Sequence, residues 1–510
     1  MDDLIEISRL IASFGVKRPD SFLSDDEFPM ITAFFNGLAS GEFTDDEVAA
    51  QKLYGTSSDD VRYRKLKLRL RYKLYDAAIF INFEPPTFST LRQKMYECNR
   101  EQTAMKQCIE NGAHDAGFII AQKLLKKARK YHLTIVEIEC LYAILNHIVA
   151  CIGDEQQYEL VSQELREAQL KLNAETNAEI LFGSVSVKYA VVNSDHPENA
   201  PFILDCIHQF EELLKNFDTF KIRYSYFILR SWYAQIQRQF TDKIAVCDDA
   251  IEYFKNNPNI AGNLIAVFTL EKAECYLHLR EYQTFLQLSK ECESFFLKLT
   301  SNWLILKSYE VQALLSIGQL IPALELFNSV KKSLMRSGGG VEKFNEHWLV
   351  LEGYIYFFLY TQSEETLPEN YRRPQLLTYL RKLSTTQITA LANDKTGANL
   401  GIHIVHLLLL FALKSEPEVI AEKVVALDRY KRRYVLQESN QRTETFITMI
   451  RHFAFENFET INTSYRTKSL FQSLSPIDKN FYVDSLEAYE LIPFDIIWTR
   501  IMTHYGVARQ

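Results

Sequence analysis

Residues 223–257 read RYSYFILRSWYAQIQRQFTDKIAVCDDAIEYFKNN, and this stretch decides the fold. Its first half has the pattern of a helix that carries Trp232 and Tyr233, and Phe240 opens a second helix after a short break. Apolar and small side chains follow at spacings of four, three and three residues, at Ile244, Cys247 and Ala250. Such spacing places side chains on one helix face, so the stretch is predicted to form two packed antiparallel helices.

The same pattern returns further along the chain. In a second copy Tyr282 opens the later helix, whose small and apolar face carries Phe285, Ser289 and Cys292. In a third copy Leu320 takes this place, and the face carries Ala323, Phe327 and Val330. A fourth copy begins at Trp348, Leu351 and Glu352. Helix-period segments without a β-rich block extend over residues 118–434, so we expect an all-α fold.

These copies resemble the tetratricopeptide repeat family. Gly318 stands where that family prefers glycine at the turn, and Ala323 stands where it prefers alanine on the second helix. The copies are 42 and 38 residues apart, whereas the family repeat is about 34 residues long. The resemblance implies an α-solenoid of stacked hairpins and supplies no ligand-binding residues. The layout is also similar to that of a bacterial family of helical proteins, which implies no activity.

Three regions are expected along the chain. Residues 1–86 are predicted to be a small N-terminal helical domain, in which Thr44 is a candidate N-cap. Residues 87–435 would hold the tetratricopeptide-like repeats, and residues 436–510 would form helices that cap the solenoid. Pro85 and Pro86 mark the first boundary, and Pro476 and Pro493 mark breaks between the C-terminal helices, because the residue before a proline is pushed out of helical geometry.

Composition favours an intracellular, cytoplasmic protein that does not enter a membrane. The net charge is −8 and the pI is 5.9, so the chain as a whole does not attract nucleic acid or an anionic membrane. The acidic residues 1–10 lack the pattern of a secretory signal, and the apolar residues 400–413 are too few to span a bilayer. The eight cysteines form no C-x-x-C pair, which indicates reduced core residues.

One segment has an unusual charge. Seven cations are interleaved with leucine and tyrosine within residues 62–73: Arg62, Arg64, Lys65, Lys67, Arg69, Arg71 and Lys73. Strict alternation fits a strand with one basic face, but Leu, Lys and Arg are good helix formers, and no β-branched residue follows Val61 within the run. We therefore favour a helix.

Three roles are open for this basic segment. The cations can pair with the acidic residues 25–27, 45–47 and 59–60 of the same chain, or they can bind an acidic protein partner. They can also contact the phosphates of a nucleic acid, because residues 44–80 resemble a helix-turn-helix in outline. That third role would require Arg64, Lys67, Arg69 and Arg71 to lie exposed on one face. We expect pairing within the chain, or exposure of the cations to solvent alone, to account for the run.

No pattern predicts catalysis, a cofactor or a metal. His403 and His406 have a spacing that suits two metal ligands, but no third ligand lies nearby in the sequence, so we expect core histidines. The glycines at 338–340 follow a helix and lack the strand and the Lys-Ser/Thr pair of a phosphate loop. Hydrolase, kinase and zinc-protease signatures are missing from the sequence. We therefore expect that the protein is not an enzyme.

The sequence favours a protein–protein interaction scaffold or adaptor that holds a protein or peptide partner in a helical-repeat groove. The side chains of the first helix in each hairpin, from Trp232 to Gly353, are expected to line one concave surface. The alternative is a regulator that binds nucleic acid through the basic segment and senses a partner through the solenoid. The oligomeric state is not predicted.

Overall fold

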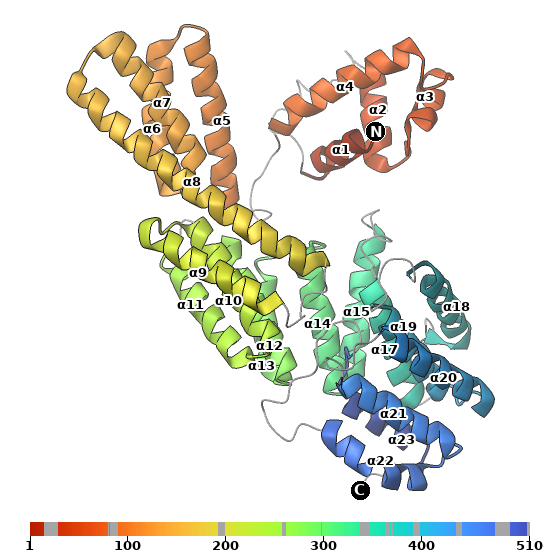
Figure 1. Ribbon diagram of the computed structural model, residues 1–510. Helices are drawn as coiled ribbons and strands as arrows, with labels where there is room; N and C mark the ends of the chain where they lie inside the picture. The colour runs from red at the N-terminus through yellow and green to blue at the C-terminus, as the bar shows by residue number, and fades with distance from the viewer. Residues whose placement is uncertain are drawn as a thin grey trace. The chain divides into compact units, whose positions relative to one another are not determined.

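The computed structural model (Figure 1) describes residues 1–14, 29–79, 81, 90–191, 199–257, 262–296, 298–336, 346–362, 368, 371–390, 398–434, 441–474 and 490–506. Every regular element within these ranges is a helix, which confirms the all-α prediction. The chain divides into two compact units, Met1–Ala174 and Glu175–Gln510. The expected boundaries after residues 86 and 435 lie outside the described ranges and stay predictions.

Four helices at the start of unit 1 enclose one apolar cluster: α1 (Asp2–Phe14), α2 (Pro29–Ser40), α3 (Asp46–Tyr54) and α4 (Val61–Ile79). The N-cap of α3 is Asp45, not Thr44 as predicted. The Asp45 carboxylate accepts a hydrogen bond from the Val48 amide at 2.9 Å, whereas the Thr44 hydroxyl donates to Asp45. Aspartate at an N-cap satisfies one of the free amides of the first turn, so the helix begins one residue later.

The remaining helices of unit 1 are α5 (Thr90–Glu110), α6 (His114–Lys130), α7 (Thr134–His147), the π-helical turn η2 (Ile148–Ile152) and α8 (Glu155–Val191), which continues into unit 2. Each of α5, α6 and α7 packs against the next. Within the described ranges one helical stretch, Thr134–Ile152, is long and apolar enough to cross a membrane by length and composition alone. Nearly half of it is buried, and Val136, Cys140 and Ile144 pack against α6.

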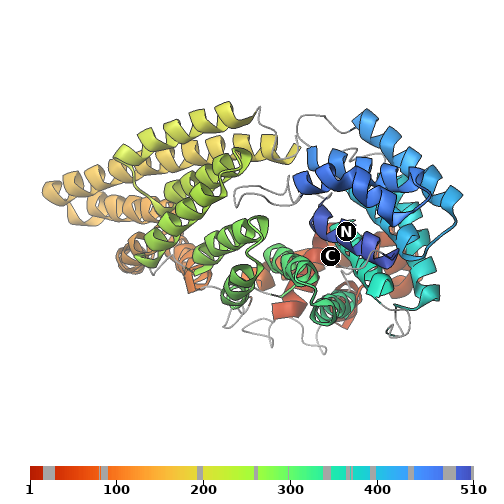
Figure 2. The same cartoon turned by 90° about the horizontal axis from the view of Figure 1, so that it is seen from below.

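Unit 2 continues with helices, most of which pack against the next one in chain order (Figure 2). The first seven are α9 (Ala200–Asn216), α10 (Phe220–Ile236), α11 (Phe240–Lys255), α12 (Gly262–His278), α13 (Tyr282–Glu293), α14 (Ser301–Ser316) and α15 (Leu320–Arg336). They are followed by α17 (Glu346–Gln362), α18 (Arg373–Ala390), α19 (Ala398–Ala412), α20 (Pro417–Tyr434), α21 (Gln441–Phe455), α22 (Thr460–Leu474) and α23 (Phe494–His504).

One turn geometry recurs at seven helical hairpins. In each, one residue has a positive φ, and the next amide donates to the carbonyl five residues before it at 2.8–3.1 Å. This is the Schellman ending of a helix, which satisfies carbonyls that the last turn leaves free. The left-handed positions are Gly112, His132, Arg238, Arg280, Gly318, Lys414 and Asn457. Only two are glycines, so five turns lack the residue that most often marks such an ending in a sequence.

Helices α14 to α23 share one large apolar core, with α17 and α19 enclosed by their neighbours. Along α17 the residues Trp348–Leu351 and Tyr354–Tyr360 are all buried. A helix that is apolar all round needs cover on every side, and α14, α15, α19 and α23 pack against α17. The C-terminal helix α23 therefore covers α17 and α19 as well as α21 and α22.

Candidate functional site

The basic segment is helical and forms most of α4, as the sequence favoured. Its apolar face packs into the cluster of unit 1 through Tyr63, Leu66, Leu70, Leu74 and Ala77. The Tyr63 hydroxyl donates to Asp46 at 2.7 Å, and burial together with this carboxylate raises the pKa of Tyr63. These contacts fix the rotation of α4, and they decide which cations face the rest of the chain.

Ion pairs within unit 1 hold three of the seven cations of the basic segment. Lys67 lies 2.8 Å from Asp46, Arg71 lies 3.2 Å from Asp3, and Arg62 lies 2.8 Å from Asp60. The pairings with Asp46 and Asp60 are of the kind expected from the sequence, whereas the pairing with Asp3 joins α4 to α1. The acidic residues 25–27 lie outside the described ranges.

The other four cations differ in exposure. Arg64, Lys65 and Arg69 are exposed, and Lys73 is half-buried with a contact of its own. The arrangement expected for nucleic-acid binding needed Lys67 and Arg71 on the same free face as Arg64 and Arg69. Both are instead half-buried in ion pairs, so only part of that face is available.

An open pocket of about 720 Å³ lies in unit 2 between α15, α17 and α18. Its floor holds three tyrosines, Tyr356, Tyr371 and Tyr379, and we call this site the tyrosine pocket. The ring of Tyr356 lies 5.0 Å from that of Tyr371 and 5.1 Å from that of Tyr379, distances typical of packed aromatic pairs. The rim carries Lys331, Lys332, Lys382, Gln375 and Thr378.

Hydrogen bonds hold two of the three tyrosines in place. Tyr371 donates to Asn328 Oδ1 at 2.9 Å, and Tyr379 donates to the Leu349 carbonyl at 2.7 Å. Burial, reinforced by the charge of Glu352, raises the pKa of each of the three pocket tyrosines. The three hydroxyls are therefore uncharged at neutral pH, and because those of Tyr371 and Tyr379 donate within the protein, the floor offers mainly aromatic surface.

Glu352 is the acidic residue that lines the tyrosine pocket. Its side chain is largely buried, and the Lys331 ammonium lies 2.6 Å from its Oε1. Because this pair is neutral as a whole, the exposed Lys332 leaves the rim with an excess of positive charge. The lining residues that the structure describes include no cysteine, serine or histidine, so the pocket lacks the usual nucleophile and base pairs.

A second polar cluster lies inside α10–α14 and is enclosed. Lys243 is fully buried, with its ammonium 2.7 Å from Glu271 and 2.9 Å from Glu274, and Tyr309 donates to Glu274 at 2.7 Å. His278 stacks on Phe240 at 4.4 Å, and burial lowers the pKa of His278 to about 4. A buried charge needs such partners, so we assign the cluster to stability.

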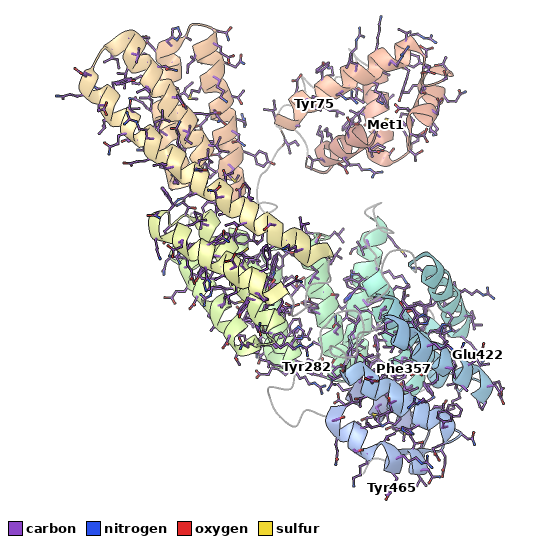
Figure 3. All side chains as sticks on the ribbon, viewed as in Figure 1. Met1, Tyr75, Tyr282, Phe357, Glu422 and Tyr465 are labelled. Atoms are coloured by element: carbon purple, nitrogen blue, oxygen red, sulfur yellow. The ribbon has the colours of Figure 1, made fainter. Side chains whose placement is uncertain are left out.

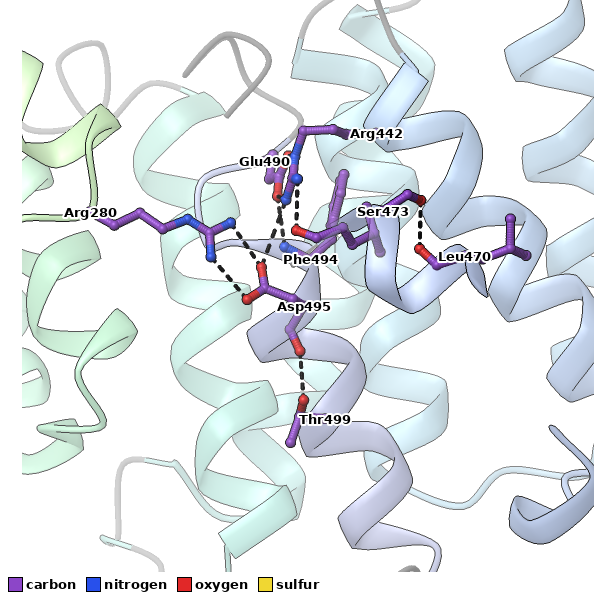
Figure 4. Close-up of polar contacts among 9 residues, drawn as sticks. Arg280, Arg442, Leu470, Ser473, Glu490, Phe494, Asp495 and Thr499 are labelled. Atoms are coloured by element: carbon purple, nitrogen blue, oxygen red, sulfur yellow. Dashed lines mark hydrogen bonds and ion pairs between the residues drawn. The ribbon is translucent and has the colours of Figure 1, made fainter. Parts of the chain in front are cut away.

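A buried ion network ties the C-terminal helix to the turn between α12 and α13 (Figure 4). Both terminal nitrogens of Arg280 lie 2.9 Å from the Asp495 carboxylate, although the two residues are 215 positions apart. Arg442 donates to both oxygens of Glu490 at 2.7 and 2.9 Å. These contacts fix the start of α23 against α12, α13 and α21.

The expected concave surface is not continuous to its predicted end. Trp348 is buried with its ring 5.7 Å from that of Phe327. A Cβ on Gly353 would lie 2.1 Å from Val405 Cγ1, so α17 and α19 are in close contact there. Trp348 and Gly353 are therefore interior positions of α17, and they do not line a groove.

The two histidines of α19 lie apart from the tyrosine pocket. Burial lowers the pKa of both His403 and His406 to about 4, and the ring of His403 lies 4.8 Å from that of Tyr430. No group of three or more possible metal ligands occurs among the described residues. The glycines at 338–340 lie outside the described ranges.

Sequence patterns did not single out the tyrosine pocket. Tyr356, Tyr371 and Tyr379 come from three separate segments, and the sequence shows only that α17 is dense in aromatics. In comparisons with protein-family models, with curated proteins and with solved structures, nothing matches this chain. The resemblance to tetratricopeptide repeats therefore stays a prediction.

Proposed function

We propose that this protein is a non-enzymatic interaction adaptor, in which tetratricopeptide-like hairpins of unit 2 form a solenoid and the tyrosine pocket binds a segment of a partner protein. The recurring hairpin turn and the packing of consecutive helices support the solenoid. The tyrosine pocket carries the proposal, because open sites lined by tyrosine provide the large, rigid contact area that dominates binding energy.

The chemistry of the pocket favours a particular kind of segment. An apolar side chain of the partner would lie on the floor against Tyr356 and Tyr379, where it loses its contact with water. Acidic residues beside it would meet Lys332 on the rim. We therefore propose an acidic segment with one aromatic or aliphatic anchor.

Site-specific photo-crosslinking tests this proposal on the full chain. A photoreactive phenylalanine analogue replaces Thr378, which lines the tyrosine pocket, or Leu377, which is exposed on the same helix but does not line it. In extracts of the native organism, the probe at 378 should capture partner proteins that the probe at 377 does not. Lys332→Glu should reduce that capture. Identical captured proteins at both positions would contradict the proposal.

A further inference from the structure

The solvent face of α4 carries a second line of large apolar side chains. Val61, Leu68, Tyr72, Tyr75 and Ile79 are all between 46% and 61% exposed, and Figure 3 marks Tyr75 on this face. The apolar residues that pack into unit 1 lie on the opposite face of the same helix. Since that packed face fixes α4, the exposed line cannot turn inward without unpacking the cluster.

The spacing of this line is that of a coiled-coil seam. Leu68, Tyr72, Tyr75 and Ile79 are separated by four, three and four residues. Lys65 occupies the position of the same line between Val61 and Leu68. Alternating steps of three and four keep side chains on the seam between two helices that pack along their length. Single exposed apolar residues are common, but a regular line along a whole helix is typical of an interaction surface.

The rows that flank the seam are basic. They hold Arg62 and Arg69 on one side and Arg64 and Arg71 on the other, with Asp76 as the one acidic member. Arg62 and Arg71 have carboxylate partners within unit 1, whereas Arg64 and Arg69 are exposed. In paired helices, opposite charges in the flanking rows determine which partner helix binds.

We propose that the seam of α4 binds an amphipathic helix of another protein, with an apolar stripe and acidic flanking residues. A second copy of this chain fits poorly, because basic rows would face basic rows. Nucleic acid would engage Arg64 and Arg69 but would leave five apolar side chains without a role. This site is in unit 1 and does not depend on the tyrosine pocket.

Two designed peptides test the proposal against the full chain. Both are three heptads long, about the length of α4, with leucine on the seam. One carries glutamate and the other lysine in the flanking rows, so that neither pairs with itself. Fluorescence anisotropy of the labelled peptides at ~0.1 M salt should show at least tenfold tighter binding of the glutamate peptide.

Substitutions then locate the contact. Leu68→Asp or Tyr72→Asp should weaken binding of the glutamate peptide at least tenfold, whereas Ile119→Asp, at a similarly exposed position on α6, should not. Arg64→Glu with Arg69→Glu should reverse the preference in favour of the lysine peptide. Loss of folding would not produce such a reversal.

Other results would overturn the proposal. Equal binding of the two peptides, or no binding of either, would remove it. Duplex DNA and vesicles with anionic lipid serve as competing probes. If Arg64→Glu with Arg69→Glu weakens the binding of either probe more than it weakens the binding of the glutamate peptide, the face is assigned to phosphates. Self-association that Leu68→Asp abolishes would assign the seam to a second copy of this chain.

Discussion

Replacing Lys243 with methionine removes one charge from the interior of α10–α14. The Lys243 side chain is fully buried, and its ammonium contacts Glu271, Glu274 and Gln235. Burial by itself would raise the pKa of Glu274, but the nearby Lys243 holds that pKa well below its usual range. The carboxylate is therefore charged at neutral pH, with Lys243 as its counter-charge and Tyr309 as a hydrogen-bond donor.

The expected loss in the free energy of unfolding depends on the groups that surround residue 243 after Lys243→Met. Methionine keeps most of the volume of lysine, so little packing is lost. Glu274 becomes a buried carboxylate without a counter-charge, and breaking a buried pair in this way costs about 3–5 kcal/mol. Because the Glu271 side chain is 24% exposed and keeps part of its hydration, we expect a value near the lower end, about 3 kcal/mol.

Urea unfolding followed by tryptophan fluorescence measures this loss in unit 2, where all four tryptophans lie: Trp232, Trp303, Trp348 and Trp498. Lys272→Met is the matched control, because Lys272 pairs with Asp248 at the surface and should cost less than about 1 kcal/mol. Adding Glu274→Gln to Lys243→Met should recover about 1 kcal/mol or more, since a neutral amide needs no counter-charge. Equal losses for Lys243→Met and Lys272→Met would refute the reasoning.

Three further predictions concern the same unfolding measurement. Gly318→Ala should lower the free energy of unfolding by about 1 kcal/mol, because φ is 76° there and nothing crowds the new methyl group. Gly183→Ala, inside α8, should leave the free energy of unfolding unchanged or raise it when unfolding is followed by circular dichroism. Burial keeps the pKa of His278 near 4, below its unfolded value of about 6.5. The stability that the neutral, buried His278 gives the fold is therefore complete above pH 6.5 and is lost as the pH falls toward 4. His278→Phe should therefore reduce the loss of stability between pH 7 and pH 5 by about 2 kcal/mol, and an unchanged loss would contradict this. Gly353→Ala should cost about 1–3 kcal/mol, because its Cβ would overlap Val405, and a Val405→Ala background should relieve part of that cost.

Local patterns were sufficient for the helices. The spacing behind Phe240, Tyr282 and Leu320 predicted three second helices, and α11, α13 and α15 begin at these residues. Helix propensity was also sufficient for the basic segment, where leucine, lysine and arginine outweighed a strand-like alternation. The N-cap of α3 was missed by one residue, because Thr44 and Asp45 are both good caps and only the backbone geometry separates them.

The candidate sites depended on contacts that no local pattern contains. The tyrosine pocket needs α15, α17 and α18 side by side, and α17 became interior because α19 and α23 cover it. Which cations of the basic segment are paired could not be read from the segment alone. Arg71 pairs with Asp3 on α1, which is more than 60 residues away in the sequence.

The sequence by itself determined that this chain is helical, where the second helices of three hairpins begin, and that residues 62–73 concentrate positive charge. These properties depend on neighbours within a few turns of one helix, so the order of residues specifies them. Only the tertiary structure decided which apolar faces are covered, which cations are paired, and where a pocket stays open. Those outcomes depend on packing between distant segments, such as Arg280 with Asp495, and that packing is a property of the folded chain.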